Sequence, residues 1–167
     1  IKGAYKYLEN KDPSLRILAS GVTLNFAIDA EKELKKLGIS TEIWSITSFN
    51  ELYKDGIEVE RLNRYENKKG VSHVESCFSE CLPTVAVSEY VRAYTNQIRQ
   101  WVNGDYITLG TDGFGRSDTR EELRNYFEIS KDHIVVNALF VSGNKDKAEK
   151  YIKDKKIDLN SKAPWLR

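Results

Sequence analysis

Apolar and polar positions alternate along the chain in two different ways, which predicts strands and helices in turn. Four short segments are almost continuously apolar or rich in β-branched and aromatic residues, as is typical of strands buried on both faces. These segments are 15–21, 41–46, 83–87 and 105–110. A fifth segment, 3–8, alternates apolar and polar residues, which indicates a half-exposed edge strand that is a candidate for antiparallel pairing.

Between the predicted strands, apolar residues recur at helical spacing. Apolar positions from Leu24 to Leu37 share one face, and Gly38 follows where a helix commonly ends. Ser48, with Glu51 three residues later, is the sequence of a capping box, so we expect a helix to begin there.

The same alternation continues in the second half of the chain. Apolar residues line one helical face over 90–102. Asp118 with Glu121 is expected to cap another helix, and helical patterns extend from there to about Lys155. Because strands and helices alternate and the strands are nearly continuously apolar, we expect an α/β fold in which helices cover both faces of a mostly parallel sheet.

The composition fits one globular domain over 1–167, since domains commonly have ~100–200 residues. Lys and Arg total 26 and Asp and Glu total 25, whereas a chain that coats nucleic acid or an anionic membrane usually carries an excess of basic residues. No apolar run approaches the ~18–20 residues that cross a bilayer. We therefore expect neither nucleic acid nor a membrane among its partners.

The start of the chain and its cysteines bear on where the protein works. The sequence begins at Ile1 and contains no methionine, so we interpret it as processed or as cut from a longer protein. Two cysteines are too few for a disulfide framework in a chain of this length, and no signal peptide is visible at the start. The low cysteine count and the lack of a visible signal peptide favour a cytoplasmic protein.

The most distinctive segment joins the strand predicted at 105–110 to the next helix. It consists of Thr111, Asp112, Gly113, Phe114, Gly115, Arg116, Ser117 and Asp118. The segment follows the carboxyl end of a strand, where open α/β folds place their ligands.

A nucleotide-binding turn explains this segment poorly. Gly113 and Gly115 resemble the start of a phosphate-binding turn, but the third glycine position holds Asp118, and Asp112 would also repel a pyrophosphate. No Gly-Lys-Ser/Thr sequence occurs either. A tight turn and a helix cap account for the glycines and Asp118. They leave Asp112, Arg116 and Ser117 as candidates for an interface or the edge of a site.

His73, Cys77 and Cys81 have metal-like spacing, but the geometry argues against a metal site. On one helix the first and last would be ~12 Å apart at 1.5 Å rise per residue, too far to bind one ion together. His73 with Cys77 would need a third ligand from elsewhere, so we expect two small buried thiols instead. His133 follows Ser130, an expected N-cap, and fits a first-turn surface position better than a catalytic base.

Two stretches of the sequence resemble one known family. The first is 45–52, followed by Asp55-Gly56 and 60–63; the second is 109–121, followed by Leu123-Arg124 and Phe127-Glu128. Both resemble the C-terminal domain of the homodimeric bacterial pyruvate dehydrogenases, the thiamine-diphosphate-dependent first components of the pyruvate dehydrogenase complex. The alternatives are a C-terminal domain from another transketolase-superfamily enzyme, against which the 111–118 segment argues, and a free-standing interaction module.

The resemblance implies a three-layer α/β/α domain of the transketolase C-terminal type. Its five-stranded mixed sheet would have the order 1-3-2-4-5, with strand 1 antiparallel. In the implied parent enzyme, earlier domains bind thiamine diphosphate and Mg²⁺, and decarboxylation of pyruvate precedes acetyl transfer to a lipoyl domain. The implied partners are the parent's own N-terminal and middle domains, a homodimer partner and the acyltransferase component.

The resemblance gives this chain no catalytic, cofactor-binding or metal-binding residue. The family's cofactor motif, Gly-Asp-Gly followed by Asn, is absent from the sequence. We therefore expect the chain alone to be inactive and to serve assembly and dimer packing. The segment 111–118 is carried over as a loop that approaches the dimer partner or the active-site region.

Overall fold

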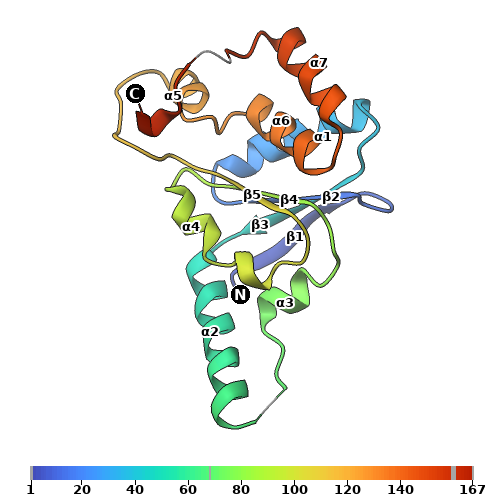
Figure 1. Ribbon diagram of the computed structural model, residues 1–167, viewed down its shortest axis with the longest axis vertical. Helices are drawn as coiled ribbons and strands as arrows, with labels where there is room; N and C mark the ends of the chain where they lie inside the picture. Colours follow the sequence, from blue (N-terminus) through green and yellow to red (C-terminus); the bar gives the residue numbers. More distant parts are fainter. Residues whose placement is uncertain (1, 68, 159–160, 167) are drawn as a thin grey trace.

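Five strands form one mixed sheet at the centre of the computed structural model (Figure 1), which describes residues 2–67, 69–158 and 161–166. Along the sheet the order is β1-β3-β2-β4-β5. Only β1 is antiparallel to its neighbour among the described strands; β2, β3, β4 and β5 pair in parallel. The strands are β1 (Ala4–Glu9), β2 (Leu15–Ala19), β3 (Thr41–Ile46), β4 (Thr84–Val87) and β5 (Tyr106–Leu109). The predicted mixed sheet, its order and its antiparallel first strand are confirmed.

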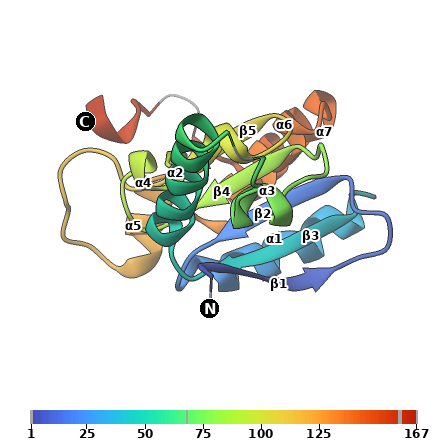
Figure 2. The same cartoon turned by 90° about the horizontal axis from the view of Figure 1, so that it is seen from below.

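Helices cover both faces of the sheet, so the predicted three layers are confirmed (Figures 1 and 2). One face carries α1 (Thr23–Lys36), α6 (Lys131–Val141) and α7 (Lys145–Lys155). The other carries α2 (Phe49–Tyr65), α3 (His73–Cys77), α4 (Arg92–Asn96) and the 3₁₀ turn η1 (Arg99–Trp101). The short helix α5 (Arg120–Tyr126) follows β5, and the 3₁₀ turn η2 (Pro164–Leu166) lies near the end of the chain.

Successive strand residues point into two separate hydrophobic cores. In β4, Val85 and Val87 face α1 and α6, whereas Ala86 faces the α2 side. In β2, Ile17 and Leu18 divide between the two cores in the same way. Because both faces are buried, these strands need apolar residues at nearly every position, which is the pattern seen in the sequence.

The prediction of one continuous helix over 90–102 is wrong. The chain instead forms the five-residue α4 and then η1. The Thr95 hydroxyl donates to the carbonyl of Arg92, which offers the backbone an alternative to helical hydrogen bonding. Tyr106 of β5 then donates its hydroxyl to the carbonyl of Thr95 at 2.7 Å, so the segment is held to the sheet at this break.

Two predicted caps differ from the structure in detail. Ser48 caps α2 as expected, with its Oγ accepting the backbone N–H of Glu51 at 3.1 Å, but the carboxylate of Glu51 pairs with Lys54. The cap of α5 is Thr119 and not Asp118. Asp118 accepts the backbone N–H of Thr119 at 2.7 Å, so its carboxylate fixes the residue that caps the helix.

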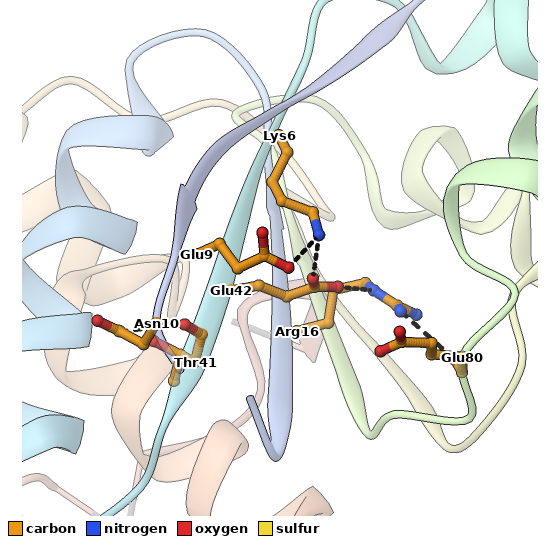
Figure 3. A network of polar contacts seen from close by, with 7 residues as sticks. All are labelled: Lys6, Glu9, Asn10, Arg16, Thr41, Glu42 and Glu80. Carbon is orange, nitrogen blue, oxygen red and sulfur yellow. Dashed lines mark hydrogen bonds and ion pairs between the residues drawn. The ribbon is translucent and has the colours of Figure 1, made fainter. Parts of the chain in front are cut away.

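A buried ion pair joins β2 to β3 on the α2 side of the sheet (Figure 3). Arg16 and Glu42 stand directly opposite each other in the parallel register, and each side chain is no more than 3% exposed. Arg16 Nε donates to Glu42 Oε1 at 2.6 Å, and Lys6 of the edge strand approaches the other carboxylate oxygen at 3.2 Å. The Arg16 guanidinium also lies over the ring of Phe78 at 5.2 Å.

The pair determines the protonation of Glu42. Burial by itself raises the pKa of this carboxyl group, but hydrogen bonds and charge from Arg16, with help from Lys6, outweigh burial. The net effect is a pKa below the usual value, so Glu42 is ionised at neutral pH and Arg16 keeps its counter-charge.

Replacing Glu42 with Gln is expected to lower the free energy of unfolding at pH 7 by about 3–5 kcal/mol, because Arg16 would remain buried without a counter-charge. The depressed folded-state pKa means that the pair's stabilisation is present above the unfolded pKa of about 4.3 and is lost as pH falls through the folded value. Urea unfolding at several pH values should therefore show the difference from the wild type shrinking in acid. Glu58→Gln, at a half-exposed surface pair, is the control; equal losses in both variants would contradict the expectation.

Helix α2 packs closely against η1 at Gly56. A Cβ at this position would lie 2.6 Å from the ring of Trp101, which is 6% exposed. Trp101 is also fixed by its indole N–H, which donates to Glu60 at 3.0 Å. The ring therefore has little room to move away from the helix.

Gly56→Ala is expected to destabilise the domain by about 1–3 kcal/mol through overpacking, although alanine is the better helix former. In a Trp101→Phe background the contacted ring atoms are absent, so the same substitution should cost less or stabilise. Thermal and urea unfolding of the four proteins in this double-mutant cycle measures the coupling. An identical effect in both backgrounds would show that the contact does not limit packing.

Candidate functional site

The segment 111–118 forms a loop at the carboxyl end of the sheet, as its position in the sequence predicts. It begins close against the connection between β4 and α4: a Cβ at Gly110 would lie 2.5 Å from the carbonyl oxygen of Tyr90. Thr111 then donates its backbone N–H to Tyr90 at 2.9 Å and its hydroxyl to the carbonyl of Glu89 at 2.6 Å. The base of the loop is thus tied to the neighbouring connection.

Asp112 makes a two-pronged contact with the first residue of α4. Its Oδ1 accepts the backbone N–H of Arg92 at 2.9 Å, and its Oδ2 accepts Nε of the same residue at 2.6 Å. Both side chains are about one-third exposed or less, at 36% and 24%. These contacts within the domain account for Asp112, whose role the sequence left open.

The end of the chain lies against the same loop. The Arg92 guanidinium is 4.2 Å from the centre of the Trp165 ring, a cation–π contact. Gly113, at φ +97°, backs onto Pro164 and Trp165, and a Cβ there would meet their backbone at 3.1 Å. Figure 1 shows η2 beside the loop. No sequence pattern predicts this contact, because its partners are far apart along the chain.

The tip of the loop faces solvent. All residues from 113 to 118 are exposed, including Ser117, and the Phe114 side chain is 86% exposed. Arg116 donates from Nε to the hydroxyl of Tyr126 at 3.3 Å and lies over its ring, which connects the tip to α5. The structure therefore brings Thr111 and Asp112 into the domain and leaves Gly113 to Asp118 at its surface.

Exposed apolar side chains gather around this loop. Each of them belongs to the loop, to the segment just before α4 or to η2, and these three segments touch one another. They are Tyr90, Val91, Phe114, Trp165 and Leu166. We call these five residues the apolar patch. Contiguous exposed apolar surface on a folded chain commonly marks an interaction site.

The structure does not gather His73, Cys77 and Cys81 into a set of three ligands, and among the described residues no group of three His, Cys, Asp or Glu side chains is placed to hold a metal ion. The prediction of two buried thiols is wrong: Cys77 is only partly buried and Cys81 is exposed. Helix α3 ends at Cys77, so Cys81 lies outside it, and Phe78 takes the core position. Burial raises the pKa of the Cys77 thiol, whose sulfur lies 3.5 Å from His73 Nε2.

His133 lies in the first turn of α6, as predicted, but is half-buried instead of on the surface. Its Nδ1 is 2.9 Å from the hydroxyl of Ser130, the residue that precedes the helix. Nearby, Tyr151 donates to Asp132 at 2.6 Å, and burial with this hydrogen bond raises the pKa of the phenol. The hydrogen bond between Tyr151 and Asp132 joins α7 to α6.

No helix among the described residues is long and apolar enough to cross a bilayer.

The similar proteins align with most of this chain, but the alignment covers only a small part of their own length. Pyruvate dehydrogenase E1 component from Pseudomonas aeruginosa is 44% identical over 147 residues, which is 83% of this chain and 17% of that protein. The proteins of the same name from Mycolicibacterium smegmatis and Escherichia coli K12 are 41% and 38% identical, and the match again spans 83% of this chain and 16% of each relative.

Solved structures and a family comparison agree on the fold. Transketolase from Leishmania mexicana superposes with a TM-score of 0.62 at 20% identity, covering 85% of this chain and 18% of that protein. Transketolase from Campylobacter jejuni gives a TM-score of 0.57 at 19% identity with the same coverage. Residues 3–130, from β1 through α5, match the transketolase-like TK C-terminal domain, and the chain therefore belongs to that family.

Proposed function

We propose that this chain is the C-terminal domain of a thiamine-diphosphate-dependent pyruvate dehydrogenase. The parent is a longer, homodimeric, cytoplasmic enzyme that decarboxylates pyruvate and transfers the acetyl group to a lipoyl domain. Residues 1–167 form one domain of that parent, and its partners are the preceding domains, the dimer partner and the acyltransferase component.

One observation carries this proposal over its closest alternative. Identity to the three pyruvate dehydrogenase E1 components described above is 38–44%, whereas the two transketolases of known structure share only 19–20% of residues with this chain. The transketolase likeness therefore supports a common fold, and the higher identity supports a pyruvate dehydrogenase parent.

The residues of this chain do not fit a thiamine diphosphate and Mg²⁺ site. The described residues hold no group of three metal-ligating side chains, and the sequence lacks the Gly-Asp-Gly motif. We therefore assign the cofactor and the chemistry to the preceding domains and derive no catalytic step from this chain.

The loop 111–118 and the apolar patch serve assembly in this proposal. A phenylalanine that is 86% exposed contributes little to the domain that carries it, but burying such a ring against a partner is worth about 1.5–3 kcal/mol. Asp112 and Arg92 hold the base of the loop. The surface lies at the carboxyl end of the sheet, and in this proposal it packs against the rest of the parent enzyme.

The 167-residue chain is expected to bind neither thiamine diphosphate with Mg²⁺ nor pyruvate, because the groups that hold them lie in other domains of the proposed parent. Calorimetric titration of the purified chain tests this, and micromolar binding of the cofactor would contradict it. Sequencing the gene upstream of Ile1 supplies the second half of the test. A reading frame that continues for several hundred residues and encodes the cofactor motif supports the proposal, whereas a start codon directly before Ile1 supports a free-standing module.

Phe114→Ser in the full-length protein is expected to weaken dimer assembly or pyruvate-dependent activity about tenfold, the loss that corresponds to about 1.4 kcal/mol of buried contact. The melting temperature of the 167-residue chain should stay unchanged. Tyr65→Ser, at a 79% exposed aromatic residue at the far end of α2, is the matched control. Sedimentation measures assembly. A large drop in melting temperature with full activity would show that Phe114 is only structural.

Asp112→Asn should have a mixed effect, because Asp112 positions the loop through Arg92. This partly exposed pair is worth about 1 kcal/mol or less to the domain. In the full-length protein we expect a loss of assembly or activity larger than this change in stability predicts. For the same substitution, the change in the free energy of unfolding of the domain is compared with the change in the free energy of assembly or activation of the full-length protein. The comparison separates positioning from simple stabilisation. Agreement between the two values would contradict the positioning role.

A further inference from the structure

The connections after β2 and β4 leave the sheet on opposite faces. These strands are neighbours, but the chain passes from β2 into α1 on one face and from β4 into α4 on the other. Open α/β sheets bind their ligands in the crevice that opens where two such connections diverge. The order of the strands therefore marks one position on this domain as a candidate ligand site, independently of any residue in it.

A pocket of about 430 Å³ lies at this position. Val22, from the connection after β2, and Glu89, from the connection after β4, stand at its two sides. Thr111 of the loop 111–118, helix α5 and the turn after it supply the rest, with Phe127 and Ile129 at 9% and 2% exposure as its floor. The floor is apolar and rigid, because both of these residues also belong to the hydrophobic core under α6.

The rim of the pocket is mainly basic. Arg120 and Arg124 of α5 line it together with one acid, Glu89. Arg124 is held in place by stacking, since its guanidinium lies 4.5 Å from the centre of the Phe26 ring. Its contact with Glu89 is long, at 3.5 Å, and the Glu89 side chain is 49% exposed. A strong charge-assisted hydrogen bond is about 2.7–2.9 Å long. Arg124 can therefore donate to a bound anion at a shorter distance than it does to Glu89.

We propose that this pocket binds a small carboxylate that carries a short apolar chain. The carboxylate pairs with Arg124, whose planar guanidinium suits a two-oxygen anion. The apolar chain lies over Phe127 and Ile129 and beside Val22, whose side chain is 38% exposed and loses most of its contact with water on binding. A ligand with only one of these features leaves either the arginines or the apolar floor unsatisfied. The pocket adjoins the apolar patch through Thr111 and Glu89 but shares no residue with it, and it does not depend on the proposed parent's activity.

The probe is hexanoate, titrated into the 167-residue chain and followed by ¹⁵N NMR and calorimetry. Acetate, which lacks the apolar chain, and hexan-1-ol, which lacks the charge, are the comparison ligands. We expect hexanoate to bind at least about tenfold more tightly than either. Compared with hexan-1-ol it gains a hydrogen bond between charged groups, and compared with acetate it buries additional CH₂ groups. Chemical-shift changes should centre on Val22, Leu123 and Phe127. Equal binding of hexanoate and hexan-1-ol, or shift changes elsewhere, would overturn the proposal.

Two variants test the role of Arg124. Arg124→Gln should weaken hexanoate binding about tenfold and leave hexan-1-ol binding unchanged, whereas Arg61→Gln, at a surface arginine of α2, should change neither. If Arg124→Gln fails to fold, Arg124→Lys keeps the charge without the planar fork and should lose part of the effect. Unchanged hexanoate affinity in a folded Arg124 variant would overturn the proposal. So would the absence of hexanoate binding to the full-length protein, since neighbouring domains would then fill the pocket.

Discussion

Every residue of β2, β3 and β4 is buried, because helices cover both faces of these strands. A sheet in this situation cannot send its polar side chains to water on one side, as an antiparallel sheet with a solvent face does. The chain must instead supply two apolar layers of helices, and successive connections must reach both faces. The divergence between the connections after β2 and β4 follows from this requirement. So does the position of the loop 111–118, which returns from β5 on the edge of the sheet to α5 and α6.

The same burial explains why the charged residues of the inner strands occur as a matched pair. A lone arginine or glutamate in these strands would lose its hydration without compensation. Arg16 and Glu42 avoid this because the parallel register places them opposite each other, and Lys6 of β1 contacts the second carboxylate oxygen while it also pairs with Glu9. The contact also specifies the register. If one strand shifted by one residue, the two charges would separate and the side chains of that strand would point to the opposite face of the sheet. The edge strand is thus linked to the centre of the sheet by electrostatics as well as by backbone pairing.

Sequence patterns within short segments predicted the helices and strands well. They predicted contacts between distant segments poorly. Continuous apolar runs located the inner strands, and the alternation at 3–8 located the edge strand. Periodicity over 90–102 identified Ile98, Trp101 and Val102 as buried, but it predicted neither the exposure of Tyr90 and Val91 nor the break after α4, because residues can stay buried while the backbone changes its hydrogen bonding. The spacing of His73, Cys77 and Cys81 likewise does not indicate where α3 ends. Because the helix ends at Cys77, the prediction that Cys81 is buried is wrong. The contacts of Asp112 with Arg92, and of Arg92 with Trp165, have no local signature at all.

The stacking of Trp165 on Arg92 gives this domain a natural optical reporter. The chain has three tryptophans; Trp44 and Trp101 are 8% and 6% exposed, whereas Trp165 is 48% exposed. A water-soluble quencher of fluorescence therefore reaches the indole beside the loop far more readily than the two indoles in the core. Emission that the quencher removes reports the surroundings of the loop, and emission that survives reports the folding of the core. One unlabelled protein thus carries separate signals for its interior and for the surface it presents to others.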